Sequence, residues 1–218
     1  MKRSFIVLAA LFCGSAPAMA ADDGDLAGFY AGLQGGYSWG DAPQPYGNPA
    51  STTTFPYYQA GAQQSGGTVG IYTGYNLQRG PLLLGLEGDI NLDRADGNDG
   101  RSGGDVNGVK HRWSANIRGR VGYVVGGGTA VYAAGGVAFL NAKATNLSRT
   151  PAEEIDTSWT GWTLGAGVEH AFSRRISARI EYRYADYGDR VARFTTSGYA
   201  ELINPKINTV QAGVAYRF

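Results

Sequence analysis

The last residues of the chain alternate between two kinds of side chain. The apolar set falls on one face of an extended chain: Val210, Ala212, Val214, Tyr216 and Phe218. The other face holds small or polar residues, from Thr209 to Arg217. A period of two is typical of a β-strand whose two faces meet different environments. Because the pattern ends on an aromatic residue, we expect this strand to close a barrel and to place its apolar face against something other than water.

The same alternation recurs along the chain and predicts eight strands. Their expected ranges are 28–39, 67–78, 82–94, 111–124, 130–141, 158–171, 176–187 and 208–218. The fifth range is mildly apolar on both faces, which leaves its register open. Glycine is abundant, with 34 residues where average usage would give roughly 15.

The connections between these strands alternate between short and long. Short turns are expected at 79–81, 125–128 and 172–175, and long polar loops at 40–66, 95–110, 142–157 and 188–204. Such an alternation is typical of an up-and-down meander whose two ends lie in different compartments. We therefore predict an all-β fold, an eight-stranded antiparallel up-and-down transmembrane β-barrel, with its short turns and both chain ends on the periplasmic side.

The charged residues decide which face meets lipid. Nine of them lie opposite the apolar face: Glu87, Asp89, Arg118, Arg120, Glu169, Arg179, Glu181, Arg183 and Arg217. A soluble, lipocalin-like barrel would point these charges outward. Two observations favour the membrane instead: aromatic residues gather at the strand ends of the apolar face, as in interfacial girdles, and glycines share the charged face, where a narrow interior needs empty places. Because unpaired buried charges are costly, we predict that the nine form a salt-bridged network in the lumen.

The amino end has the pattern of a secretion signal. Lys2 and Arg3 precede an apolar run at 5–12, and Ala18 and Ala20 form a small-x-small cleavage site. We expect a signal peptide over 1–20 and a barrel domain over 21–218.

Removal of this segment would also take away the single cysteine and two positive charges. The formal net charge would change from +1 to about −1, since +1 minus 2 is −1. A mature chain without cysteine has no disulfide, and a near-neutral chain gives no support to nucleic-acid binding.

The sequence offers little catalytic chemistry. Only His111 and His170 could serve a hydrolase, and His111, near the outer rim, is the better placed. Neither lies in a His-x-Ser pattern like that of lipid A deacylases. Asp96, Asp99 and Asp105 do not have the spacing of an EF-hand loop. We predict no catalytic residue, no metal ligand and no cofactor.

Four stretches carry a resemblance to a known family: GFYAGLQGGY at 28–37, GWTLGAGVE at 161–169, ARIEYRY at 178–184 and VAYRF at 214–218. With these the chain resembles the small outer-membrane β-barrel proteins of alphaproteobacteria, the immunogenic, porin-family proteins of brucellae and rhizobia. They are related in architecture to the OmpA transmembrane domain and the opacity proteins. The resemblance implies a Gram-negative outer-membrane location, and it implies that Val214, Tyr216 and Phe218 are recognised by the barrel-assembly machinery during insertion. No OmpA-type wall-binding domain is expected after the barrel.

Two functions remain open. The first is an envelope-structural and surface-interaction role, in which the four long loops contact lipopolysaccharide or host surfaces. The alternative is a small porin-like channel for ions or small solutes. Eight strands leave an interior just wide enough for side chains, which favours the first function. The description of the family as porin-like favours the second function, the channel.

Overall fold

The computed structural model describes residues 26–47, 58–98, 107–146, 153–193 and 200–218. Its strands are β1 (Gly28–Gly47), β2 (Tyr58–Arg79), β3 (Leu82–Asn98), β4 (Asn107–Gly126), β5 (Thr129–Asn146), β6 (Glu153–Ala171), β7 (Ile176–Asp186), β8 (Arg190–Arg193), β9 (Ala200–Ile203) and β10 (Lys206–Arg217). The expected signal segment, with Ala18 and Ala20, lies outside the described residues. Within them, no helix is long and apolar enough to cross a membrane.

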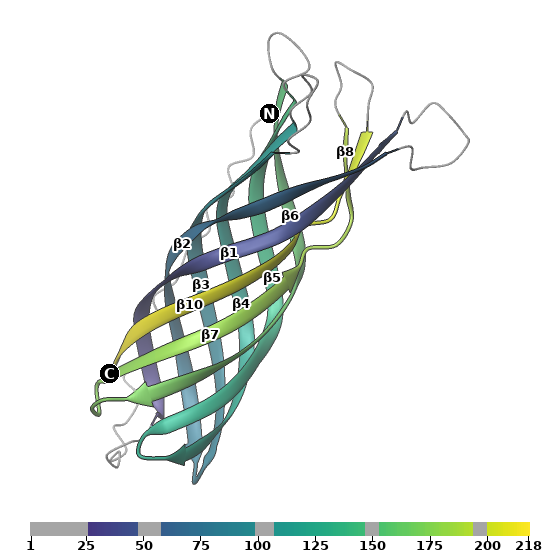
Figure 1. Ribbon diagram of the computed structural model, residues 1–218. Coiled ribbons are helices and arrows are strands. Elements are labelled where there is room, and N and C mark those ends of the chain that lie inside the picture. The colour runs from purple at the N-terminus through teal and green to yellow at the C-terminus, as the bar shows by residue number, and fades with distance from the viewer. Residues whose placement is uncertain (1–25, 48–57, 99–106, 147–152, 194–199) are drawn as a thin grey trace, which may run out of the picture.

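Eight of these strands close into a barrel (Figure 1). Each of β1 to β6 pairs antiparallel with the next, and β10 pairs with both β7 and β1. At the closing seam Leu33 lies opposite Val214, and Val214 lies opposite Ala178. This confirms the eight-stranded antiparallel up-and-down barrel, and it gives the last strand the two neighbours expected of it.

The barrel is apolar outside and polar inside. Leu33, Ile180 and Leu92 have exposed fractions of 69%, 65% and 63%, whereas Arg118 and Glu181 are fully buried. A soluble protein has the reverse arrangement, because water favours charges on the outside. Because the sheet closes on itself and leaves no edge within the barrel, this surface suits the hydrocarbon core of a bilayer.

Aromatic side chains mark both ends of the apolar belt. Phe29 and Tyr75 are in contact near the short turns, with ring centroids 4.5 Å apart. Towards the opposite end, Trp162 and Tyr184 are 5.4 Å apart. Rings of this kind are typical of the two interfaces of a membrane.

Strands extend into all four long connections, which corrects the prediction that these ranges are loops throughout. The ranges 40–66, 95–110 and 142–157 contain continuations of β1 to β6, and 188–204 contains the hairpin β8–β9. The hairpin adds to the edge of β1 through Tyr46 and Gly47 (Figure 1). Beyond the bilayer both faces of a strand meet water, so the apolar alternation disappears while the backbone pairing continues.

A β-bulge reverses the predicted direction of one charge. The alternation placed Arg112 on the interior face with Ser114. The pairing of β4 with β5 shifts between His111 and Trp113. As a result His111 is buried inside and Arg112 is exposed outside. An extra residue in one strand leaves two neighbours opposite one partner and turns a side chain away from its expected face.

The register of β5, which the sequence left open, is settled by its contacts. Tyr132, Ala134 and Leu140 are buried in the barrel, while Val131 and Val137 are exposed. The tyrosine therefore belongs to the lumen, where its hydroxyl has partners. The small side chains beside it keep the strand close to its neighbours.

The lipid face can be tested at Leu33, near the middle of the apolar belt on β1. In Leu33→Arg we expect the free energy of unfolding in phospholipid vesicles, measured by urea titration, to fall by about 2–4 kcal/mol. The control Leu33→Met keeps an apolar side chain of similar volume and should remain close to the unaltered protein. Equal stability of the arginine variant would contradict a lipid-facing exterior.

Candidate functional site

The barrel interior is the candidate site, because the alternating residues of all eight strands converge there. At mid-height, Glu87 of β3 is the centre of the interior. It is 1% exposed. Its Oε1 accepts from Arg118 Nη2 at 2.5 Å, and its Oε2 accepts from Tyr30 Oη at 2.9 Å. Arg179, from the opposite wall, also donates to Oε2. One carboxylate thus joins β1, β3, β4 and β7 across the lumen.

A second carboxylate, Glu181, extends the network towards the outer side. Arg118 Nη1 donates to Glu181 Oε1 at 2.7 Å, and Arg183 lies 3.1 Å from the same oxygen. Arg183 Nη1 in turn donates to Asp89 Oδ1 at 3.0 Å. Arg118 therefore has carboxylates on two sides of the barrel, and its side chain is fully buried.

Towards the periplasmic side, Glu169 is the acceptor. Arg120 Nη2 donates to its Oε2 at 2.7 Å, and Ser177 Oγ donates to its Oε1 at 2.8 Å. Arg217 lies 3.5 Å from Oε1. Arg120 also contacts Glu87 at 3.4 Å, which links this group to the rest.

The structure places all nine predicted lumen charges in one connected network of ion pairs. They are five arginines and four carboxylates, each nine-tenths or more buried. Neutral side chains also accept from the arginines, since Arg179 Nη2 donates to Gln34 Oε1 at 2.8 Å. Pairs of this kind are stable in a buried place only when most of their hydrogen-bonding capacity is used.

Sequence reasoning missed three tyrosines in this network. Tyr132 Oη donates to Glu181 at 2.9 Å. The guanidinium of Arg120 lies 4.1 Å from the centre of the Tyr132 ring, and that of Arg179 lies 3.7 Å from the Tyr72 ring. Tyr30, Tyr72 and Tyr132 all alternate onto the charged face of their strands, and this was the signal that could have found them.

Glycines make the room that these rings need. A Cβ at Gly32 would lie 2.7 Å from Cε1 of Tyr72, and one at Gly167 would lie 2.7 Å from the hydroxyl of Tyr132. Real Cβ atoms do not approach other atoms so closely. The tyrosines therefore cross a narrow lumen by resting on backbone that carries no side chain.

An apolar layer closes the periplasmic end. Leu26, just before β1, is fully buried with Leu83 and Ala130. Its backbone N–H donates to Gln78 Oε1 at 2.8 Å, and its carbonyl accepts from Asn76 Nδ2 at 3.1 Å. The chain that enters the first strand thus fills the mouth of the barrel.

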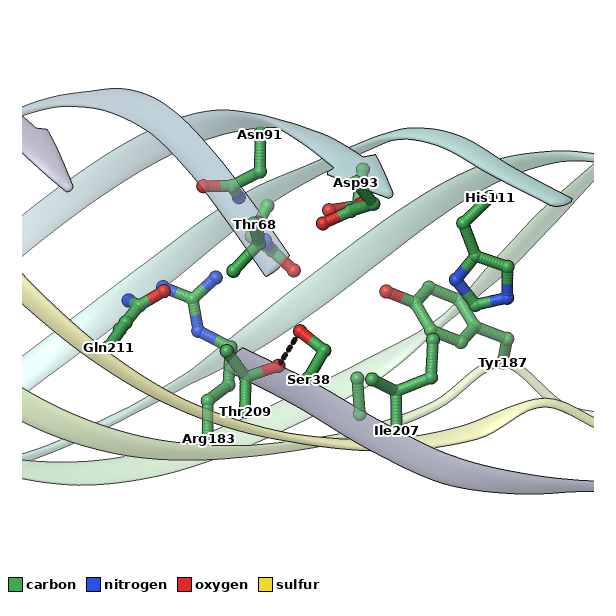
Figure 2. Close-up of a pocket in the computed structure, with 13 residues that line it drawn as sticks. Ser38, Thr68, Asn91, Asp93, His111, Arg183, Tyr187, Ile207, Thr209 and Gln211 are labelled. Atoms are coloured by element: carbon green, nitrogen blue, oxygen red, sulfur yellow. Dashed lines mark hydrogen bonds between the residues drawn. The ribbon is translucent and has the colours of Figure 1, made fainter. Parts of the chain in front are cut away.

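The outer half of the lumen holds a second apolar cluster and a small cavity. Trp159 and Leu140, each 1% exposed, pack with Tyr187. Beside them the cavity offers about 30 Å³ to water, room for about two molecules. Figure 2 shows His111 and Tyr187 at one end of this cavity and Arg183 and Gln211 at the other.

The remaining candidates are not brought together. His111 lines the outer cavity, whereas His170 lies near the periplasmic end, where its Nδ1 is 2.8 Å from Thr129 Oγ1. Asp96 is in β3, and Asp99 and Asp105 lie outside the described residues. Among the described residues, no group of three or more His, Cys, Asp or Glu could hold a metal ion.

The three terminal residues that we expect to guide assembly all face outward. Val214, Tyr216 and Phe218 have exposed fractions of 56%, 43% and 82%. The rings of Tyr216 and Phe218 are 5.3 Å apart, and Arg175 Nη1 donates to the Tyr216 hydroxyl at 3.1 Å. These side chains are therefore not part of the lumen network.

Comparison with known proteins agrees with this architecture. The family described as "Outer membrane protein beta-barrel domain" matches residues 6–218. A 22 kDa outer membrane protein of Rhizobium leguminosarum bv. viciae is 33% identical, with 89% of this chain and 79% of the relative covered. A 31 kDa outer-membrane immunogenic protein of Brucella melitensis is 30% identical, with 94% and 89% covered. The crystal structure of the outer membrane protein OprG from Pseudomonas aeruginosa shares the fold at 9% identity, with a TM-score of 0.56 and 88% and 97% covered.

Removing the negative charge of Glu87 should destabilise the protein strongly. In Glu87→Gln, Arg118, Arg120 and Arg179 lose their shared carboxylate charge inside the barrel. We expect the free energy of unfolding in vesicles to fall by about 3–5 kcal/mol, the cost of breaking a buried pair. The matched control is Asp156→Asn, which removes an exposed carboxylate 3.5 Å from Arg112 and should change stability by less than about 1 kcal/mol. Equal effects at the two positions would contradict the central role of Glu87.

The packing of rings on glycine gives a second test on one strand. In Gly32→Ala the new methyl group would overlap the Tyr72 ring, and we expect a loss of about 1–3 kcal/mol of unfolding free energy. In Gly35→Ala, the nearest atom to the new Cβ is 3.6 Å away, so stability should stay the same or rise by up to about 1 kcal/mol. Urea titration of both variants in vesicles measures the difference. A loss at Gly35 as large as that at Gly32 would rule out the ring contact as its cause.

Proposed function

The chain belongs to the outer membrane protein β-barrel family, and from that premise we propose that it is a closed structural barrel that displays an extended sheet outside the cell. Proteins of this family lie in the Gram-negative outer membrane, and the apolar belt described above suits that place. The observation that carries the proposal is the buried ion-pair network around Glu87.

The network supports a closed barrel because, among the described residues, it stands across the path that a solute would take. Arg118 and Arg179 reach Glu87 from different walls, so the central cross-section is filled by side chains. Leu26 closes the periplasmic mouth, and Trp159 fills part of the outer half. A passing ion would have to separate several buried pairs at once, and each separation is costly.

The outer strands supply the part that other molecules can reach. A membrane-spanning strand needs about 9–11 residues. β7 and β10 have 11 and 12 residues, whereas β1 and β2 have 20 and 22. The surplus stands beyond the outer girdle and, with β8–β9, forms a sheet around the mouth (Figure 1). We propose that lipopolysaccharide or host surfaces meet the protein there, within 40–66, 95–110, 142–157 and 188–204. The Brucella relative is named as immunogenic, and a sheet outside the cell is what antibodies would reach.

The alternative function is a small channel. The polar cavity in the outer half of the lumen favours it, because Ser38, Thr68 and Thr209 line this space. This space ends on Arg183, inside the network, and it holds only about two water molecules. The same small volume argues against an enzyme, since a substrate could not reach His111. We therefore place no catalytic residue, metal or cofactor in the lumen.

Conductance separates the two functions. We expect the refolded protein in planar bilayers to show no stable single-channel steps, because the ion pairs fill the lumen. A triple variant Glu87→Ala, Arg118→Ala, Arg179→Ala removes the central side chains and should conduct if it inserts. Heat-dependent mobility on a gel confirms that each sample is folded.

A stable conductance of the unaltered protein would overturn the structural proposal. If the protein is a channel, bulky substitutions at Gly167 or Gly213, which both face the lumen, should abolish that conductance. The matched control is Gly35→Leu on the exterior, which should leave any conductance unchanged.

A further inference from the structure

The bulge in β4 turns a cation out of the barrel at a defined height. Arg112 would face the lumen if the alternation of β4 continued. The register shift between His111 and Trp113 places it outside instead, with 58% of its side chain exposed. Bulges often serve to redirect a side chain, and this one moves a charge out of the barrel interior.

Two further cations lie on the adjoining strands. On β3, Arg94 is exposed and follows Leu92 on the outer face, opposite the stretch where the β3–β4 pairing is interrupted. On β5, Lys143 shares the outer face with Val137 and Phe139, one step beyond the bulge. The three cations thus lie on three consecutive strands, which are about 4.8 Å apart. We call Arg94, Arg112 and Lys143 the cationic face.

The cationic face borders directly on the outer edge of the apolar belt. Leu92 and Trp113 are opposite one another in the register and are the outermost apolar residues beneath Arg94 and Arg112. Asp156 on β6 lies 3.5 Å from Arg112 and opposite Lys143 in the register, and both members of the Arg112–Asp156 pair are more than half exposed. Such a pair contributes little, so a stronger anion can displace it.

Among the described side chains, the opposite side of the barrel has no such group of cations. There Lys206 of β10 lies 4.0 Å from Asp186 of β7, one cation to one acid. The cations that the structure describes at the outer rim therefore gather over β3 to β5. A flat row of cations directly above an apolar surface matches an amphiphile whose anionic groups sit at the top of its acyl chains.

We propose that the cationic face binds the phosphate groups of lipid A in the outer leaflet, while Leu92, Trp113 and Phe139 contact its acyl chains. Guanidinium groups suit phosphate because they donate two parallel hydrogen bonds. Lipid A carries phosphates on its sugar backbone at the level of the interface. This inference rests on the outer-membrane location and not on whether the barrel conducts.

The test measures lipid binding by the full chain in detergent micelles, using native mass spectrometry. The probes are bisphosphorylated lipid A, dephosphorylated lipid A and phosphatidylglycerol. Each basic residue near an anionic group contributes about fivefold, so we expect Arg94→Gln, Arg112→Gln, Lys143→Gln together to weaken lipid A binding by about a hundredfold. The dephosphorylated lipid should bind weakly to both proteins.

The matched control is Lys206→Gln, a cation of the outer rim on the opposite side, which should stay within about twofold of the unaltered protein. Heat-dependent mobility shows that both variants are folded. Unchanged binding in the triple variant, or an equal loss in Lys206→Gln, would overturn the site. Phosphatidylglycerol binding as tightly as lipid A would overturn the assignment to the outer-leaflet glycolipid. Conductance is recorded separately, so failure here is distinguishable from failure of the closed-barrel proposal.

Discussion

The ion pairs around Glu87 are the interaction on which the rest of the structure depends. A barrel of eight strands has no room for an open core, so the inward half of every strand must fill the lumen. Here the filling is charged, and arginines from β4 and β7 must meet carboxylates from β3 and β6. These contacts fix the register of strands that are far apart in sequence. They also decide that Tyr30, Tyr72 and Tyr132 lie over glycine, because long side chains leave no other space.

Much of this interior could be predicted from the sequence. Alternation alone assigns Glu87 and Arg118 to one face, and strand order places them on adjacent strands. What alternation cannot give is the partner across the lumen. Arg179 reaches Glu87 from the opposite wall, and that distance depends on strand tilt and stagger, which follow from the whole closed sheet. The contacts of the three tyrosines escape for a related reason: alternation places the rings inside, but it does not say which guanidinium or carboxylate each one meets.

The part of the barrel beyond the bilayer was harder to predict because its strands meet water on both faces. Within the bilayer one face meets lipid, and the sequence must alternate. Beyond it both faces meet water, so Pro43 and Pro45 can lie in β1 with no apolar pattern around them. Composition there resembles a loop, while the backbone continues to pair with β2. The bulge at Arg112 escaped for another reason, since one inserted residue inverts the alternation locally and leaves no mark in composition.

The bulge lies where the membrane-spanning part of the barrel meets the part beyond the bilayer. It occurs at the height where the apolar belt ends, beside Trp113, and it inverts the pattern so that Arg112 leaves the interior. Had the alternation continued, Arg112 would have entered a lumen whose five network arginines stand against five carboxylates, the four of the network and Asp93 at the outer cavity. A sixth arginine without a sixth carboxylate in that space would cost several kcal/mol. The same displacement sets Arg112 beside Arg94 and Lys143 at the membrane surface. The electrostatic balance of the closed interior and the cationic face outside are therefore two consequences of one inserted residue.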